Sequence, residues 1–182
     1  MKSVHRIIFA AILLVAMVSC STTRVLQDGE YRLTKNRIEI TNDDDFNPSQ
    51  LNKYLKQNDG LGWSPFMVVY NWSDRTGSRW DNFLEKIGKA PVVYDPDMVE
   101  SSIENITNHL EYLGYYGSTV DSEISVKKKR VTVTYDVHLG KRFPIEDINY
   151  VLPARGEFRA AFLNDTTELG IQRGDYLSEA AL

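Results

Sequence analysis

The sequence predicts a two-layer α+β domain with the element order β-α-α-β-β, followed by the start of a second one. Two features predict this fold. Five apolar residues are spaced four and three apart, on one stripe of a helix: Val99, Ile103, Ile106, Leu110 and Leu113. Directly afterwards, residues 118–126 and 130–139 place apolar side chains on one face, as half-buried strands do. A single amphipathic helix can cover one face of a small sheet, so two packed layers are expected.

The remaining elements are expected in chain order. Asp95 and Pro96 predict the start of the long helix, and Gly114 predicts its end in the left-handed conformation. The other predicted elements are a strand over 31–41, short helices over 48–57 and 80–87, an irregular stretch over 58–79, a strand over 143–152, a weak helix over 156–164 and the start of a helix over 176–182.

The first residues predict an export signal. Lys2 and Arg6 precede an apolar run over 7–18, which is shorter than the about 20 residues that a membrane-spanning helix needs. The one cysteine, Cys20, follows directly, and the small residue before it resembles the cleavage site of bacterial lipoproteins. That resemblance implies cleavage before Cys20 and attachment of lipid, palmitate included, to the chain. A plain signal peptide with a chance cysteine is the alternative.

The composition excludes several functions. The chain has 182 residues, of which 42% are hydrophobic and 25% charged, which argues against disorder and against a helical membrane protein with many spans. The net charge of −4 leaves no basic excess for binding nucleic acid, and the lysine run 127–129 is expected to be a hairpin turn. One cysteine excludes an intrachain disulfide and a zinc site of several thiolates.

Catalytic chemistry is not expected. Asp136 and His138 share one strand face at i and i+2, but no nucleophile accompanies them. His109 lies beside the helix stripe and is expected to be a boundary residue. Two histidines without clustered acids make a poor metal site. The sequence therefore predicts no enzyme, no metal and no cofactor, with a lipid-anchored hydrolase as the least favoured alternative.

Several stretches resemble POTRA domains, the periplasmic modules that precede the barrel in outer-membrane assembly factors of the BamA and TamA type. The specific resemblance is to the lipoprotein branch, often called TamL. A glycine–aromatic–aromatic–glycine turn at 114–117 is typical of these domains. The matching stretches are WSPFMVVYNWSD from Trp63, WDNFLEKIGKAPVVYDPDMVESS from Trp80, LEYLGYYGSTVDSEI from Leu110, VTVTYDVHLGKRFPIEDINY from Val131 and LGIQRGDYLSEAAL from Leu169.

The resemblance implies a domain organisation. It comprises a signal peptide over 1–19, a lipidated tether over 20–30, a first POTRA-like domain over 31–141 with an insertion over 58–95, and an incomplete second one over 142–182. The short final helix and the missing barrel predict an N-terminal piece of a longer protein. The implied location is the outer membrane of a Gram-negative bacterium, with the domains in the periplasm and the membrane contacted through the lipid anchor.

The resemblance also implies partners and a binding site. The implied role is to receive unfolded outer-membrane client proteins and to pass them to the barrel. In POTRA folds the second strand is an exposed edge that can pair with an extended peptide. The expected edge residues are Thr119, Val120, Asp121, Ser122, Glu123, Ile124 and Ser125.

Aromatic residues crowd into 63–80, where they either cap a small core or form a surface for other assembly-machinery proteins. The candidate partner surface consists of Trp63, Phe66, Tyr70 and Trp72. A lipid-anchored scaffold that contacts partners through this surface, without a role in translocation, is the second interpretation.

Overall fold

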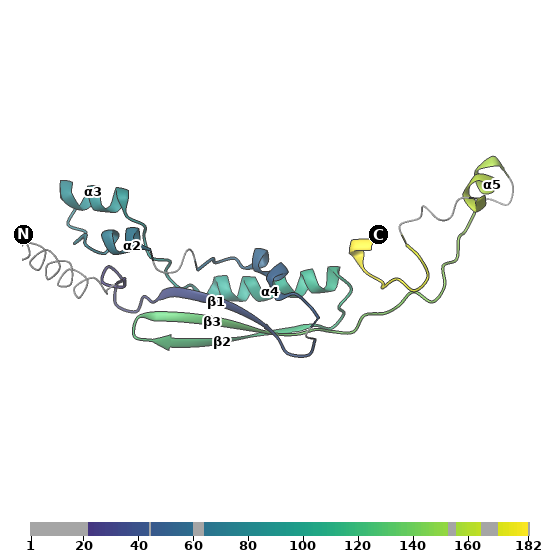
Figure 1. The fold of residues 1–182 in the computed structure, drawn as a ribbon, viewed down its shortest axis with the longest axis horizontal. Helices are drawn as coiled ribbons and strands as arrows, with labels where there is room; N and C mark the ends of the chain where they lie inside the picture. The colour runs from purple at the N-terminus through teal and green to yellow at the C-terminus, as the bar shows by residue number, and fades with distance from the viewer. Residues whose placement is uncertain (1–21, 44, 60–63, 153–155, 165–170, 182) are drawn as a thin grey trace, which may run out of the picture. The chain divides into compact units, whose positions relative to one another are not determined.

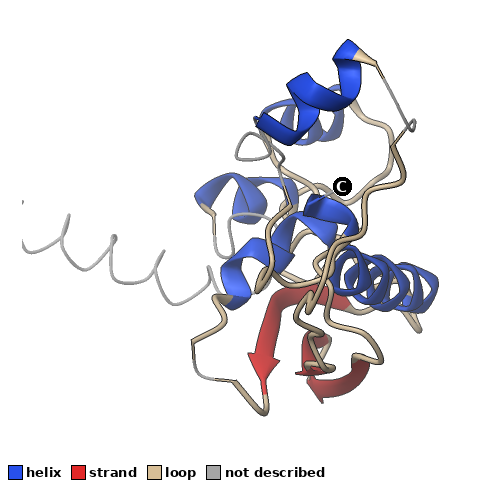
Figure 2. Ribbon diagram, turned by 90° about the vertical axis from the view of Figure 1, so that its right-hand side faces the viewer, coloured by secondary structure: helices blue, strands red, loops and turns tan. Residues whose placement is uncertain are grey.

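The computed structural model describes residues 22–43, 45–59, 64–152, 156–164 and 171–181. Within them the chain forms a three-stranded sheet, a long helix and several short helical segments (Figure 1). Figure 2 shows the strands in red and the helices in blue. The predicted α+β class with a β-α-β-β-like order is therefore confirmed. Cys20 and Trp63 lie outside the described residues.

The sheet is mixed and has the order β1-β3-β2. Its strands are β1 (Arg32–Ile40), β2 (Thr119–Lys127) and β3 (Arg130–His138). The N–H of Arg32 donates to the carbonyl of Lys129 at 2.8 Å. At the other end of the pair, the N–H of Thr41, the residue directly after β1, donates to the carbonyl of Val137 at 3.0 Å. Strands β1 and β3 thus run in the same direction, whereas a two-residue turn makes β2 and β3 antiparallel.

Helix α4 (Pro96–Tyr112) begins and ends where the sequence predicts. The carboxylate of Asp95 accepts the backbone N–H two residues further on at 3.0 Å, as an N-cap does. Gly114 has a φ of 87°, and the N–H of Tyr115 donates to the carbonyl of Leu110 at 2.9 Å. This is a Schellman ending, which requires a residue that tolerates positive φ.

The contacts divide the chain into two compact units, and β1, β2, β3 and α4 each contribute residues to both. The first unit comprises 1–37, 56–99 and 122–134, and the second comprises 38–55, 100–121 and 135–182. The buried apolar side chains of the first unit include Leu33, Met67, Leu84, Val131 and Val133. Those of the second include Leu51, Ile106, Leu110, Tyr135 and Val137. In the second unit, α4 lies along one face of the sheet (Figure 1).

Three helical segments lie between β1 and α4. They are the 3-10 helix η1 (Pro48–Tyr54) and the α-helices α2 (Pro65–Tyr70) and α3 (Arg79–Ile87). The sequence predicted η1 and α3, but it predicted irregular chain where α2 forms. Helices α2 and α3 pack against each other.

The segment after β3 differs from its prediction. Residues 143–152 do not form a regular strand; a single antiparallel bridge joins Pro144 to Tyr176. The weak helix is present as α5 (Glu157–Asn164), and the last predicted helix is a single 3-10 turn, η2 (Glu179–Ala181). The division of the chain into a first domain and the start of a second one stays a prediction.

Candidate functional site

Strand β2 forms one edge of the sheet. Val120 is buried, and every other residue of the strand is exposed. Ile124 and Val126 share the face of Val120 yet keep 44% and 52% of their surface in contact with solvent. The edge therefore offers both unpaired backbone groups and an uncovered apolar strip.

The hairpin fixes which backbone groups of β2 point outward. Lys128 and Lys129 form its loop, with Lys128 at a φ of 59°. The carbonyl of Val137 accepts a bond from the N–H of Thr41, the residue directly after β1. The backbone groups of odd-numbered residues of β3 therefore face β1, and those of even-numbered residues face β2. Because the loop between β2 and β3 has two residues, the N–H and C=O groups of odd-numbered residues of β2 point toward β3. The outward N–H and C=O groups belong to the even-numbered residues, Val120, Ser122, Ile124 and Val126.

The outer side of β1 is occupied over its first part. The N–H of Leu33 donates to the carbonyl of Val92 at 2.8 Å, and Val93 forms an antiparallel bridge with Arg32. Further along, the N–H of Asn36 donates to the carboxylate of Asp59 at 3.0 Å. Among the described residues, no backbone hydrogen bond of this kind reaches the outer side of β2. The two edges of the sheet thus differ.

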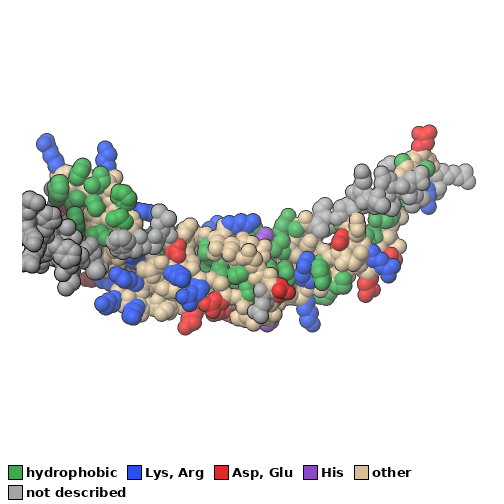
Figure 3. Space-filling model, viewed as in Figure 1, with side chains coloured by type: hydrophobic (Ala, Val, Ile, Leu, Met, Phe, Trp, Pro, Cys, Tyr) green, Lys and Arg blue, Asp and Glu red, His purple; other side chains and the backbone are tan. Residues whose placement is uncertain are grey.

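Helices α2 and α3 carry a second exposed feature. Large apolar side chains point to solvent there, and Figure 3 shows hydrophobic side chains gathered over the two helices. The α2–α3 aromatic surface consists of Phe66, Trp72, Trp80, Phe83 and Ile87. The rings of Trp80 and Phe83 stack with centroids 5.6 Å apart. Trp80 belongs to the aromatic stretch 63–80 that the sequence singled out, whereas Phe83 and Ile87 were predicted only as apolar residues of the helix over 80–87, although their spacing from Trp80 on that helix was visible.

The predicted partner residues differ in their exposure to solvent. Phe66 and Trp72 are exposed, at 60% and 51%. Tyr70 is half-buried, and its hydroxyl accepts a hydrogen bond from Arg75 at 3.3 Å, which raises the pKa of that guanidinium. Trp63 falls outside the described residues. Tyr70 therefore belongs to the interior side of the helix pair more than to its outer surface.

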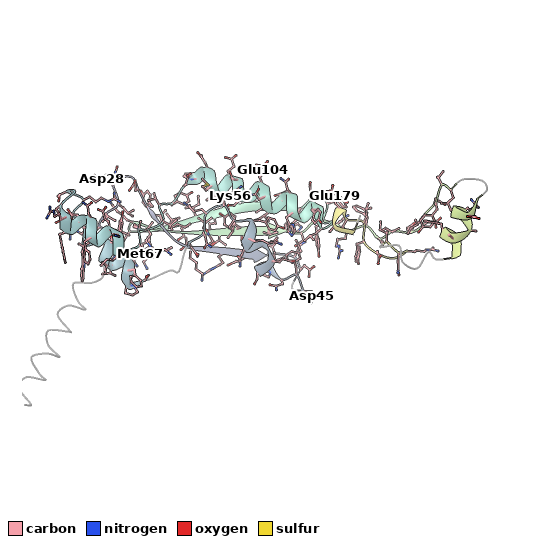
Figure 4. All side chains as sticks on the ribbon, turned by 90° about the horizontal axis from the view of Figure 1, so that it is seen from above. Asp28, Asp45, Lys56, Met67, Glu104 and Glu179 are labelled. Atoms are coloured by element: carbon pink, nitrogen blue, oxygen red, sulfur yellow. The ribbon has the colours of Figure 1, made fainter. Side chains whose placement is uncertain are left out.

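The helix pair has its own interior. Met67, which Figure 4 labels on α2, is buried together with Val68 and Leu84. A Cβ at Gly88 would lie 2.7 Å from the Cα of Tyr70, so only glycine permits this close approach of the two helices.

Asp81 fixes the loop that joins α2 to α3. Its carboxylate accepts the hydroxyl of Thr76 at 2.5 Å and the backbone N–H groups of Thr76 and Asp74 at 3.1 and 3.0 Å. These bonds, of which that from the Thr76 hydroxyl contributes most, hold the pKa of Asp81 well below its usual range. The buried carboxylate thus stabilises the conformation of the loop between α2 and α3.

The first described residues are bound to this helix pair. The N–H of Val25 donates to the side-chain oxygen of Asn71 at 3.3 Å, and Arg24 forms an ion pair with Asp74. Thr22 is buried, and its hydroxyl accepts a bond from the guanidinium of Arg32. The expected tether over 20–30 is therefore folded against the first unit from Thr22 onward.

Among the residues that the structure describes, ionisable side chains do not converge on a reaction centre. The ring of His138 lies 3.3 Å from the hydroxyl of Thr41. His109 stacks on Tyr54, with ring centroids 4.0 Å apart, and burial together with the charge of Lys53 lowers its pKa. In the part of the chain that the structure describes, no cluster of three His, Cys, Asp or Glu side chains could hold a metal. No helix among those residues is long and apolar enough to cross a bilayer.

The exposed edge of a small α+β domain can accept a further strand from another chain. Residues 34–140 match the POTRA family, described as the surface antigen variable number repeat. The match covers more than half of the chain, so the chain belongs to the POTRA family. A comparison with curated proteins gave no significant match. POTRA domains are non-catalytic protein-interaction modules, typical of the periplasmic part of outer-membrane assembly and translocation factors.

Proposed function

We propose that this chain is the periplasmic, lipid-anchored POTRA part of an outer-membrane assembly factor of the BamA and TamA type. It binds unfolded outer-membrane client chains by adding an extended client segment to the edge of β2. Cys20 carries the lipid, and the client passes on to other parts of the assembly machinery.

The observation that carries this proposal is the free edge of β2. Its outward groups at Ser122 and Ile124 repeat every second residue, the spacing at which an added strand bonds. Backbone pairing needs no particular client sequence, which suits a protein that must accept many clients. Ile124 and Val126 supply apolar contact to alternate client side chains, and outer-membrane strands alternate in the same way.

The alternation of outward and inward backbone groups along β2 allows a specific test. Proline at an outward position removes one bond to the client and leaves the bonds to β3 intact. We expect Ser122→Pro to weaken binding of a fluorescein-labelled peptide of about ten alternating apolar and polar residues. The expected loss is about tenfold in Kd by fluorescence anisotropy, which corresponds to about 1.4 kcal/mol for a lost bond and a strained edge.

Two controls accompany this variant. Ser122→Ala keeps the outward N–H and should bind the peptide like the natural chain. Glu123→Pro removes an N–H that points toward β3, so it should lower the thermal midpoint, whereas Ser122→Pro should not lower it to the same degree. Unchanged peptide affinity in a natively folded Ser122→Pro protein would show that clients do not use this edge.

A further inference from the structure

We propose that the α2–α3 aromatic surface rests on the membrane that holds the lipid anchor, with its rings at the level of the lipid headgroups. This inference depends on the proposed lipid at Cys20. It adds a membrane contact made by the folded domain itself, separate from the client edge on β2.

The exposed side chains are not needed to hold the helix pair together. Met67 and Leu84 fill the interior between α2 and α3, and Gly88 allows the helices to touch. Trp80 and Phe66 nevertheless keep 64% and 60% of their surface in solvent. An exposed apolar patch on a small domain marks a contact with another surface.

The chain length between the lipid and the fold is very short. Cys20 is two residues before Thr22, and two residues span at most about 7 Å even when fully extended. Thr22 is already buried and bonded to Arg32. Whatever the conformation before Thr22, this buried residue therefore lies within about 7 Å of the backbone of Cys20, which carries the proposed lipid.

The same segment leads directly to the aromatic surface. Arg24 pairs with Asp74, and the N–H of Val25 donates to Asn71. Asn71 and Asp74 flank Trp72 in the sequence, so Arg24 and Val25 are bonded to the same helix pair that carries the aromatic surface. A lipid at Cys20 thus holds these aromatics close to the bilayer.

The side chains have the chemistry of a membrane interface. Tryptophan is enriched at the headgroup level because its ring is apolar and its N–H is polar. All three tryptophans of the chain lie between 63 and 80. Lys86 and Lys89 are exposed on and just after α3, where they can meet anionic headgroups. A protein partner would need no such closeness to the anchor, so the lipid surface is favoured.

Tryptophan fluorescence tests the contact directly. The full lipidated chain carrying Trp63→Phe and Trp72→Phe keeps Trp80 as its one reporter. It is reconstituted into vesicles of phosphatidylethanolamine and phosphatidylglycerol, with or without phosphatidylcholine brominated near the headgroup. We expect Trp80 emission to shift to shorter wavelength in vesicles, to be quenched by the brominated lipid and to become shielded from acrylamide.

Two double variants show which surface of the protein causes the change in Trp80 emission. Phe83→Ser with Ile87→Ser, which are exposed and leave the interior untouched, should reverse the shift and restore acrylamide quenching of Trp80. Ile124→Ser with Val126→Ser removes two equally exposed apolar side chains from β2 and should leave Trp80 emission in vesicles unchanged.

The outcomes separate this inference from the anchor on which it rests. If the chain floats with vesicles and carries acyl mass at Cys20, but Trp80 emission does not change, the aromatic surface does not touch lipid. If neither flotation nor acyl mass is found, the anchor itself fails and the inference falls with it. Shielding of Trp80 that needs an added assembly protein and never occurs with lipid alone would assign the surface to a protein partner instead.

Discussion

His109 on α4 has a pKa that its neighbours shift. Its ring stacks on Tyr54, and its centroid lies 6.0 Å from that of Tyr112. Burial is the main cause of its lowered pKa, and the positive charge of Lys53 is the second. The sequence predicted a boundary residue, which fits this half-buried position.

This lowered pKa makes the stability of the second unit depend on pH. The unfolded chain binds the His109 proton more readily than the folded one. The free energy of unfolding therefore has its full value above the ordinary histidine pKa of 6.5. It decreases as the pH drops through and below that value. Urea unfolding at several pH values between 5 and 8 measures this slope. We expect His109→Gln to reduce it.

Lys53 supplies the matched test of the cause. Lys53→Gln removes the repulsion but leaves the ring buried, so it should raise the pKa of His109 toward its ordinary value and make the acid-side loss smaller. NMR titration of the His109 ring reports this shift. An unaltered titration in Lys53→Gln would assign the lowered pKa to burial alone.

At the scale of elements, the turn from α4 to β2 depends on two glycines in different ways. Gly114 has a φ of 87°, and a Cβ built on it would lie 2.2 Å from the carbonyl oxygen of Leu177. Gly117 has a φ of 74°, but a Cβ there would meet open space. Glu179, labelled in Figure 4, lies beside the end of α4 in this region.

Alanine variants of the two glycines isolate the free-energy cost of the close backbone approach at Gly114. Gly117→Ala should cost about 1–2 kcal/mol, the penalty for a left-handed residue with a Cβ. Gly114→Ala has the same conformational cost and must also displace the backbone at Leu177. We therefore expect a clearly larger loss of unfolding free energy and faster hydrogen exchange near 177–178. Equal thermal midpoints for the two variants would show that the final segment yields without cost.

Sequence patterns predicted elements well where they were long and periodic. Helix α4 carries a complete stripe with a cap at each end, and β3 alternates strictly. Helix α2 was missed because its six residues, PFMVVY, are mostly apolar and include two adjacent valines that favour strands. Its packing on α3 overrides that preference. Residues 143–152 alternate like a strand, but they form only one bridge, with Tyr176.

At the scale of the whole molecule, the POTRA core is small, and single side chains matter. Ile106 of α4 and Val137 of β3 are both completely buried. We expect Ile106→Ala to lower the free energy of unfolding by about 2–5 kcal/mol, because the cavity adds to the lost transfer energy. Ile124→Ala, at an exposed position, should change it by less than about 0.5 kcal/mol. Urea denaturation of both variants measures the difference, and similar midpoints would contradict this core.

The position of β2 at the edge of the sheet was predictable, but the direction of its individual backbone groups was not. The family resemblance pointed to Thr119–Ser125 as an edge, and the sheet order β1-β3-β2 leaves β2 at one side. Which residues turn their N–H outward depends on the two-residue loop and on the bond between Thr41 and Val137. Such pairing joins distant parts of the chain, and residue types alone do not encode it.

The occupied outer side of β1 has a consequence for how such domains can associate. A sheet with two open sides can be extended from both, so copies of it can stack without limit into fibrils. With Val92 and Asp59 bonded along β1, extension from that side is blocked over the stretch up to Asn36. Stacking of copies through this stretch of β1 would therefore require these bonds to break first.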